Sequence, residues 1–246
     1  MQPTAPRRIK KDAHLPHRTI FAALLILIAI PLVIFLGIVV WDDRKYYIVS
    51  LMIIFLSMLP FAFKFENRKP QAREIVILSV MVAIGVAGRA AFYMLPQFKP
   101  VVAIVIITGV AFGGESGFIT GASIGFISNF FFGQGPWTPW QMFGFGIIGF
   151  LAGVLFSKGI LKAKLVPLCI YGGLSTLIIY GLLLDSASLF MFSSTITWQA
   201  LLTMFSSGLV FNLIHAAATV VFLFLLSEPL LQKLERVKKK FGIMEA

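Results

Sequence analysis

The feature that most limits how this chain can fold is the run Ile20–Trp41, which contains no charged residue. As an α-helix it would be about 33 Å long, enough to cross the roughly 30 Å hydrocarbon core of a bilayer. Within lipid, a single segment satisfies its own backbone hydrogen bonds only as a helix. The run therefore predicts a membrane-spanning helix, kinked at Pro31. It lacks the small-residue cleavage site of a signal peptide, so we expect it to be retained.

Seven more apolar segments follow. They are Tyr46–Phe63, Ile75–Leu95, Val101–Phe112, Gly117–Phe132, Gln141–Phe156, Leu165–Leu184 and Ala200–Leu226. Val101–Phe112 would be only about 18 Å long, so it either needs Pro96–Pro100 to complete a crossing or crosses only partly. The composition agrees with a membrane protein, since 59% of residues are hydrophobic and 13% are charged, against about 25% charged in soluble domains. The expected fold is an all-α integral membrane protein with eight spans.

Lysine and arginine are distributed unequally between the two ends of these spans. If the N-terminus is cytoplasmic, the cytoplasmic segments hold 17 of them, including the basic tail at residues 228–246. The opposite side then holds three, which are Arg44, Lys45 and Lys99. This bias predicts that both termini are cytoplasmic. It also explains the net charge of +11 without a nucleic-acid partner.

The stretch Asn129–Gln141, N-F-F-F-G-Q-G-P-W-T-P-W-Q, interrupts the apolar pattern. Its two prolines and two glycines predict a break in regular helix, on the outer side of the membrane. Aromatic rings mixed with neutral hydrogen-bonding groups are typical of a small-molecule pocket. They are equally typical of an interfacial loop whose tryptophans set its depth in the bilayer.

Arg89 is the one cationic residue within a predicted span. A charge at mid-helix costs on the order of 3 kcal/mol on insertion scales, and such residues are usually functional. Tyr93 lies four positions later and so shares a face with Arg89. These two residues predict a pocket near the outer end of the span. The alternative is that Arg89 reaches the outer headgroups.

Small residues recur every fourth position in two segments. Ala83, Ala87 and Ala91 form one stripe, and the other is Gly113, Gly117, Gly121 and Gly125. Such stripes let helices approach closely in lipid. For the glycine stripe we expect internal packing.

Several sequence patterns argue against catalysis, metal binding and nucleotide binding by this chain. Gly144-x-Gly146-x-x-Gly149 matches a dinucleotide fingerprint, but no strand precedes it. The chain has no G-x-x-x-x-G-K-[ST] motif, and no nucleophile–base pair can be read from the spacing. Asn212 and His215 share a helical face without a further ligand at metal-binding spacing, so they predict an interhelical hydrogen bond.

Three stretches resemble a known family. They are R-A-A-F-Y-M-L-P-Q-F-K-P from Arg89, A-I-V-I-I-T-G-V-A-F-G-G-E-S-G-F-I-T-G-A from Ala103, and the aromatic stretch from Asn129. Together they are similar to the substrate-binding S component of an energy-coupling factor (ECF) vitamin transporter. The resemblance implies a six-helix substrate-binding core at residues 75–227. It leaves residues 1–19, a basic N-terminus, and 20–74, two added helices and a basic loop, outside that core.

The resemblance also implies a division of labour. S components capture a vitamin at an outward-facing pocket and work with a transmembrane coupling subunit and two ATPases, which use the ATP. No cofactor is expected to be bound permanently by this chain. An Ala-x-x-x-Ala motif on the first core helix faces the coupling subunit in the family, and Ala83, Ala87 and Ala91 match it.

The substrate is expected to be a vitamin, and the added helices and the F-G-Q-G-P-W-T-P-W run look most like cobalamin-associated members. A flavin or a queuosine-like base would suit the same rings. A stand-alone secondary transporter is the alternative function, and a membrane enzyme is least favoured. The predicted substrate-binding residues are Arg89, Tyr93, Gln97, Asn129, Phe131, Gln134, Trp137, Thr138, Trp140 and Gln141.

Overall fold

The computed structural model describes residues 17–41, 46–63, 72–193 and 197–242. In these ranges every regular element is a helix, which confirms the expected all-α membrane fold. Five helices are long and apolar enough to cross a membrane, and two shorter apolar helices accompany them. The predictions for the basic N-terminal segment 1–16, the turn 42–45, most of the basic loop at 64–71 and the last residues, 243–246, lie outside the described residues.

The helices follow the order of the predicted spans. The first span consists of α1 (His17–Leu24), a π-helical stretch (Leu25–Ala29) and α2 (Ile30–Trp41). Then come α3 (Tyr46–Phe63), α4 (Ala72–Ala91), α5 (Val101–Phe112), α6 (Gly114–Phe132) and α7 (Trp137–Ser157). The last are α8 (Leu165–Leu174), a second π-helical stretch (Ser175–Tyr180), α9 (Gly181–Phe192) and α10 (Trp198–Phe241).

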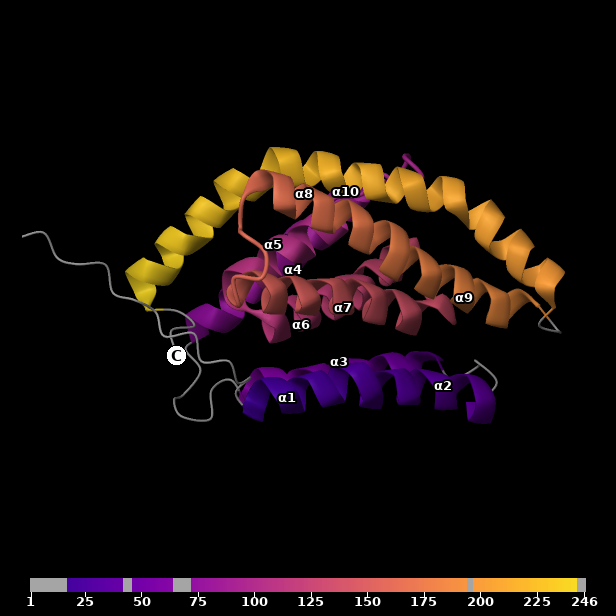
Figure 1. Ribbon diagram of the computed structural model, residues 1–246. Helices are drawn as coiled ribbons and strands as arrows, with labels where there is room; N and C mark the ends of the chain where they lie inside the picture. The colour runs from indigo at the N-terminus through magenta and orange to yellow at the C-terminus, as the bar shows by residue number, and fades with distance from the viewer. Residues whose placement is uncertain (1–16, 42–45, 64–71, 194–196, 243–246) are drawn as a thin grey trace, which may run out of the picture.

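Two of the proline-containing helices are irregular. The first π-helical stretch ends two residues before Pro31, which cannot donate a backbone hydrogen bond and crowds the preceding turn. A locally widened helix thus precedes Pro31, where the sequence predicted a kink. Pro229 lies inside α10, whose C-terminal part bends away from its long first part (Figure 1).

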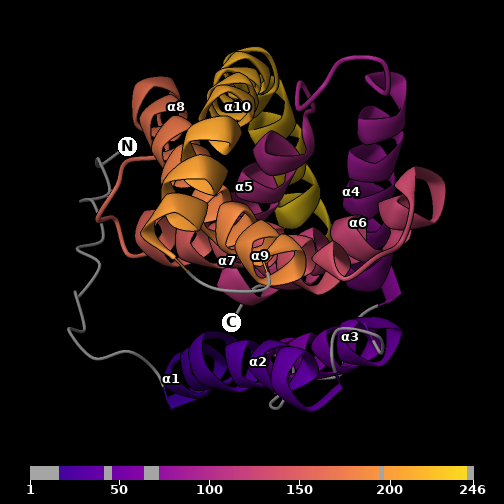
Figure 2. The same ribbon diagram turned by 90° about the vertical axis from the view of Figure 1, so that its right-hand side faces the viewer.

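The helices form layers around a central element. α1, α2 and α3 lie along one side of α6 and α7, whereas α8 and α10 cover the opposite side (Figures 1 and 2). Between them runs α5, in which ten of twelve residues are buried. Protein surrounds this short helix, so its length does not have to match the bilayer. This resolves the question that its 12 residues raised in the sequence.

The glycine stripe packs α6 against α7, as expected. A Cβ added at Gly117 would lie 2.5 Å from the carbonyl oxygen of Gly149, and one at Gly121 would lie 2.6 Å from that of Phe145. Only a glycine lets the two backbones approach this closely. The motif Gly144-x-Gly146-x-x-Gly149 thus lies within α7, where Gly146 and Gly149 face α6 and Gly144 faces Tyr180.

Replacing Gly117 with alanine is expected to destabilise the protein by about 1–3 kcal/mol, the usual range for overpacking. The added methyl group meets a backbone atom, which cannot rotate away. The apparent melting temperature in detergent would measure the loss. Gly173→Ala is the control, because the nearest atom to its added Cβ is a side-chain carbon of Val220, 3.1 Å away. Equal melting of the two variants would contradict this packing role.

The two N-terminal helices pack directly on the core. Ile26 and Ile30 of the first, and Ile53 of the second, are buried in one cluster with Phe118 of α6 and Met142 of α7. Their outer faces carry exposed apolar side chains, for example Phe35 at 58% and Phe55 at 66%. Such faces suit lipid, so the pair forms an apolar layer attached to α6 and α7.

Four predicted boundaries are wrong. The third span ends at Ala91 and not at Leu95, because residues 92–95 turn away toward α5. Most of Asn129–Gln141 is helical, and only residues 133–136 lie between α6 and α7. The prolines allow this because Pro136 caps α7 and Pro139 lies in its first turn, where backbone N–H groups have no helical partner.

The other two corrections concern α9 and α10. The seventh span, expected to end at Leu184, continues as helix to Phe192. The last helix runs on to Phe241, so the basic tail is largely helical beyond the expected end at Leu226. Lys239 and Glu235 form an ion pair of 2.8 Å at one-turn spacing there, which favours helix in a polar segment.

Candidate functional site

A cavity of about 210 Å³ lies at the end of the core where α4 ends and α5 begins. We call it the Arg89 cavity. Its walls come from α4, the segment between α4 and α5, the start of α5, the end of α6, α7, the second π-helical stretch and α10. They are Arg89, Tyr93, Pro96, Gln97, Lys99, Val101, Phe132, Gln141, Phe145, Tyr180 and His215.

The guanidinium group of Arg89 is held by two hydrogen bonds from Nη1 and by an aromatic ring against one of its faces. Its Nη1 donates to Ser128 Oγ at 2.5 Å and to Asn129 Oδ1 at 2.8 Å. The ring of Phe132 lies 4.5 Å from Cζ, a cation–π distance. No described carboxylate pairs with Arg89, which is unusual for a charge at membrane depth.

Asn129 connects three helices around this arginine. While its Oδ1 accepts from Arg89 of α4, its Nδ2 donates to Thr138 Oγ1 at 3.0 Å and to Gln141 Oε1 at 2.9 Å, both in α7. Thr138 also accepts from the backbone N–H of Gly135 at 3.2 Å. Both N–H groups and the oxygen of the amide are therefore engaged, and the network holds the positions of both Arg89 and Gln141.

Lys99 binds backbone carbonyl groups just beyond the C-terminal end of α4. Its Nζ donates to the backbone carbonyls of Phe92, of Tyr93 at 3.2 Å and of Leu95 at 2.5 Å. Carbonyls at a helix C-terminus lack helical partners and attract a cation. Burial, and after it the positive charge of Arg89, lower the pKa of Lys99. Beside Lys99, Gln97 adopts a left-handed φ of 53°, which is uncommon for residues other than glycine.

Three rings form the wall across the core. Phe145 stacks on Tyr180 with centroids 4.8 Å apart, and His215 meets the Tyr180 ring edge-on, also at 4.8 Å. His215 is 3% exposed, and within the described part of the chain its Nδ1 has no hydrogen-bond partner. Tyr180 ends the π-helical stretch, a type of irregularity that is frequent at functional sites.

The structure brings together six of the ten predicted substrate-binding residues. Arg89, Tyr93, Gln97 and Gln141 line the Arg89 cavity, whereas Asn129 and Thr138 lie directly behind it and hold its walls.

The other four predicted residues lie away from the cavity. Phe131 is 73% exposed on the opposite side of α6, and Gln134 donates to the carbonyl of Phe126 at 2.9 Å. Trp137 lies against Gly135, and Trp140 stacks on Phe190 at 6.1 Å beside the N-terminal helices. Residues of the aromatic stretch thus lie in several different environments, because successive residues of a helix point about 100° apart.

The prediction missed most of the far wall. Phe132, Phe145 and Tyr180 give no sign of a site in the sequence, where they are aromatic residues among many others. His215 was noted for its polarity, but with an interhelical bond as the expectation. In fact Asn212 makes such a bond, donating to Asp185 Oδ2 at 2.8 Å, whereas His215 lines the cavity.

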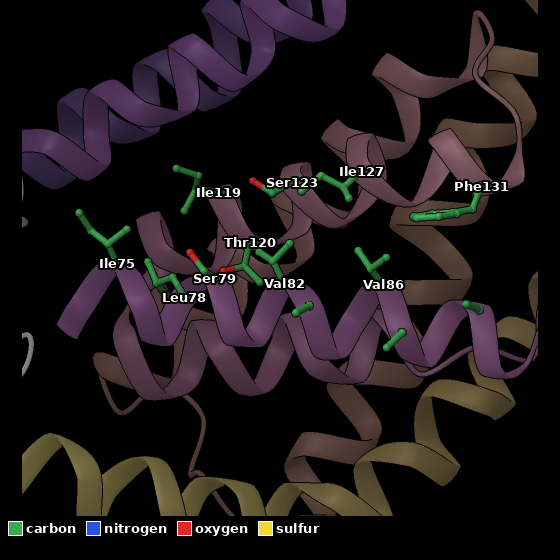
Figure 3. A pocket seen from close by; sticks show the side chains of 13 residues that line it. Ile75, Leu78, Ser79, Val82, Val86, Ile119, Thr120, Ser123, Ile127 and Phe131 are labelled. Carbon is green, nitrogen blue, oxygen red and sulfur yellow. The ribbon is translucent and has the colours of Figure 1, made fainter. Parts of the chain in front are cut away.

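A second, larger hollow lies between α4 and α6, with a volume of about 660 Å³ (Figure 3). We call it the Ala groove. Ala83 and Ala87 line it together with Ala90, whereas Ala91 does not. Phe131 closes one end, and Thr120 and Ser123 are the polar side chains on the α6 side. The predicted alanine stripe therefore borders an open, mainly apolar surface.

No group of three or more possible metal ligands occurs among the described residues. The arrangement can hold a small molecule by a fixed guanidinium group, several rings and the amides of Gln97 and Gln141.

Fold and cavity together define a multi-pass helical membrane protein with a polar, ring-lined cavity at one end of its core. The chain belongs to the ECF transporter substrate-specific component family, whose pattern matches residues 73–227. This is a family of transport subunits and not of enzymes. It confirms the resemblance to ECF S components seen in the sequence, and α1, α2 and α3 lie outside the matched region.

Among curated proteins, the chain is similar to a UPF0397 protein of Vibrio atlanticus (strain LGP32). The two are 27% identical over 104 residues, which are 39% of this chain and 57% of the relative. The chain thus spans a little over half the length of that relative. No solved structure matches the chain.

Proposed function

We propose that this chain is the substrate-capturing membrane subunit of an ATP-driven ECF importer and that its substrate binds in the Arg89 cavity. The observation that carries the proposal is the half-buried, positioned Arg89, which faces a cavity and has no described carboxylate partner. A charged side chain within a membrane span is energetically costly and is usually functional, and binding of a ligand would explain why Arg89 is there. Family membership gives the transport context.

The energy comes from partner subunits in this proposal. They are a transmembrane coupling subunit and two ATPases, and the sequence contains no P-loop of its own. The coupling subunit docks on the Ala groove, where Ala83 and Ala87 are exposed and let another helix approach closely.

The Arg89 cavity opens to the outside in this proposal. Lys158, Lys162 and Lys164 join α7 to α8 at the opposite end of the core, and basic loops favour the cytoplasmic side. The same orientation places both termini in the cytoplasm.

The substrate is a vitamin-like small molecule. The resemblance to cobalamin-associated members favours a corrinoid, but the cavity of about 210 Å³ is below the roughly 300–1,000 Å³ of pockets for drug-sized ligands. A corrinoid would require residues 92–100 and 133–136 to move apart. Without such movement the cavity suits a smaller compound, of one or two rings or a short chain. Riboflavin and queuosine-like bases remain candidates.

Binding and uptake assays with the purified chain would test the proposal. The chain alone should bind one member of a vitamin panel with sub-micromolar affinity, as measured by calorimetry in detergent. Proteoliposomes should accumulate that compound only when the coupling subunit, the ATPases and ATP are present. Accumulation by the chain alone would indicate a secondary transporter, and no binding across the panel would contradict substrate capture.

A further inference from the structure

The Arg89 cavity is electropositive. Arg89 and Lys99 both line it, and among the described residues its lining contains no aspartate or glutamate. The carboxylate of Asp185, in α9, accepts from Asn212 and does not line the cavity. A neutral ligand would leave the Arg89 charge unbalanced at membrane depth, which is costly.

The donors of Arg89 are divided between protein and cavity. Nη1 is committed to Ser128 and Asn129, whereas Nε and Nη2 have no acceptor among the described residues. Nε and Nη2 form one edge of the guanidinium fork, and such an edge matches the two oxygens of one carboxylate. Lys99 contributes its charge at this site but few donors, because its Nζ already bonds three carbonyls.

The cavity wall opposite Arg89 indicates the chemical character of the rest of the ligand. Phe145, Tyr180 and His215 present rings, with one buried nitrogen, His215 Nδ1, that has no partner within the described residues. Rings recognise a flat or apolar body, and an unpartnered nitrogen recognises one polar group. The volume of about 210 Å³ restricts that body to a small one.

From this arrangement we infer that the substrate is a small monocarboxylate whose carboxyl group binds the Nε–Nη2 edge of Arg89 and whose body lies against Phe145, Tyr180 and His215. The inference rests on the proposed substrate-capture function and names its chemical class. A phosphate fits less well, because it brings more acceptor oxygens than one free guanidinium edge can satisfy.

The test compares acids with neutral counterparts of the same shape. The pairs are pantothenate with panthenol, biotin with biotin amide, and nicotinate with nicotinamide, each titrated against the full-length protein in detergent. In at least one pair the acid should bind about 30-fold or more tightly than its counterpart, the size expected for a charge-assisted pair. Arg89→Gln should reduce this preference to less than about threefold, whereas Arg73→Gln, at the far end of α4, should preserve it.

Each other outcome overturns the inference. Equal or tighter binding of a neutral member would show that charge does not select the substrate, yet it would leave substrate capture standing. A preference for acids that persists in Arg89→Gln would place the carboxylate elsewhere. If none of the six compounds binds at 100 μM, the monocarboxylate class is wrong. In that case, binding of a neutral vitamin from the wider panel would still support the capture function.

Discussion

Replacing Arg89 with alanine is expected to weaken binding of the tightest compound found in the panel by roughly 30- to 1,000-fold. The loss corresponds to about 2–4 kcal/mol, which is typical when one partner of a buried charged pair is truncated. The change removes the only described cation whose free donors face the cavity. Calorimetry in detergent measures the affinity, and the apparent melting temperature shows whether the fold survives.

Ser128→Ala is the matched control for this variant. It removes one hydrogen bond that positions Arg89 but leaves the guanidinium group and its contact with Asn129 in place. Affinity should fall only by about 2- to 10-fold, the value of one ordinary hydrogen bond. If Arg89→Ala binds as well as the wild type, the cavity is not the substrate site.

The second large effect is expected for Ala87→Trp, which should abolish uptake by the assembled transporter and leave ligand binding within about twofold. Ala87 is exposed and lines the Ala groove, so an indole there would occupy the surface on which the coupling subunit docks. The Arg89 cavity has a different lining and should be unaffected. Co-purification with the coupling subunit and uptake into proteoliposomes would both be measured.

Ile84→Trp provides the comparison, since Ile84 is 39% exposed on the same helix but does not line the groove. It should retain uptake within about threefold if docking is confined to the groove. Loss of ligand binding in Ala87→Trp would instead indicate that the stripe packs the core. Equal loss of uptake in both variants would exclude the groove as the specific docking surface.

The sequence predicted which segments are helices with good accuracy. It predicted the residues at which these helices end less accurately. Charge-free runs such as Ile20–Trp41 can only be helices in lipid. The glycine stripe of α6 correctly indicated close packing, because glycines at every fourth position share one face. The break expected around Pro136 and Pro139 was too long, since proline is compatible with the first turn of a helix.

The site could be read only in part. Arg89, Asn129 and Gln141 were identifiable because polar groups are conspicuous among apolar neighbours, and the structure connects all three. Phe131 was chosen where Phe132 lines the cavity, although the two are adjacent in the chain. Nothing in the sequence linked Tyr180 or His215 to Arg89, from which they are separated by several helices.

The sequence by itself determined that this is a helical membrane protein, where its spans run, and that one arginine is held among them. The tertiary structure decided which helix faces meet protein and which meet lipid. The physical reason is that lipid tails and a protein interior are equally apolar, so a spanning helix has little amphipathic pattern to reveal its inner face. Packing alone therefore placed Phe132, Tyr180 and His215 around the Arg89 cavity and left Phe131 on the Ala groove.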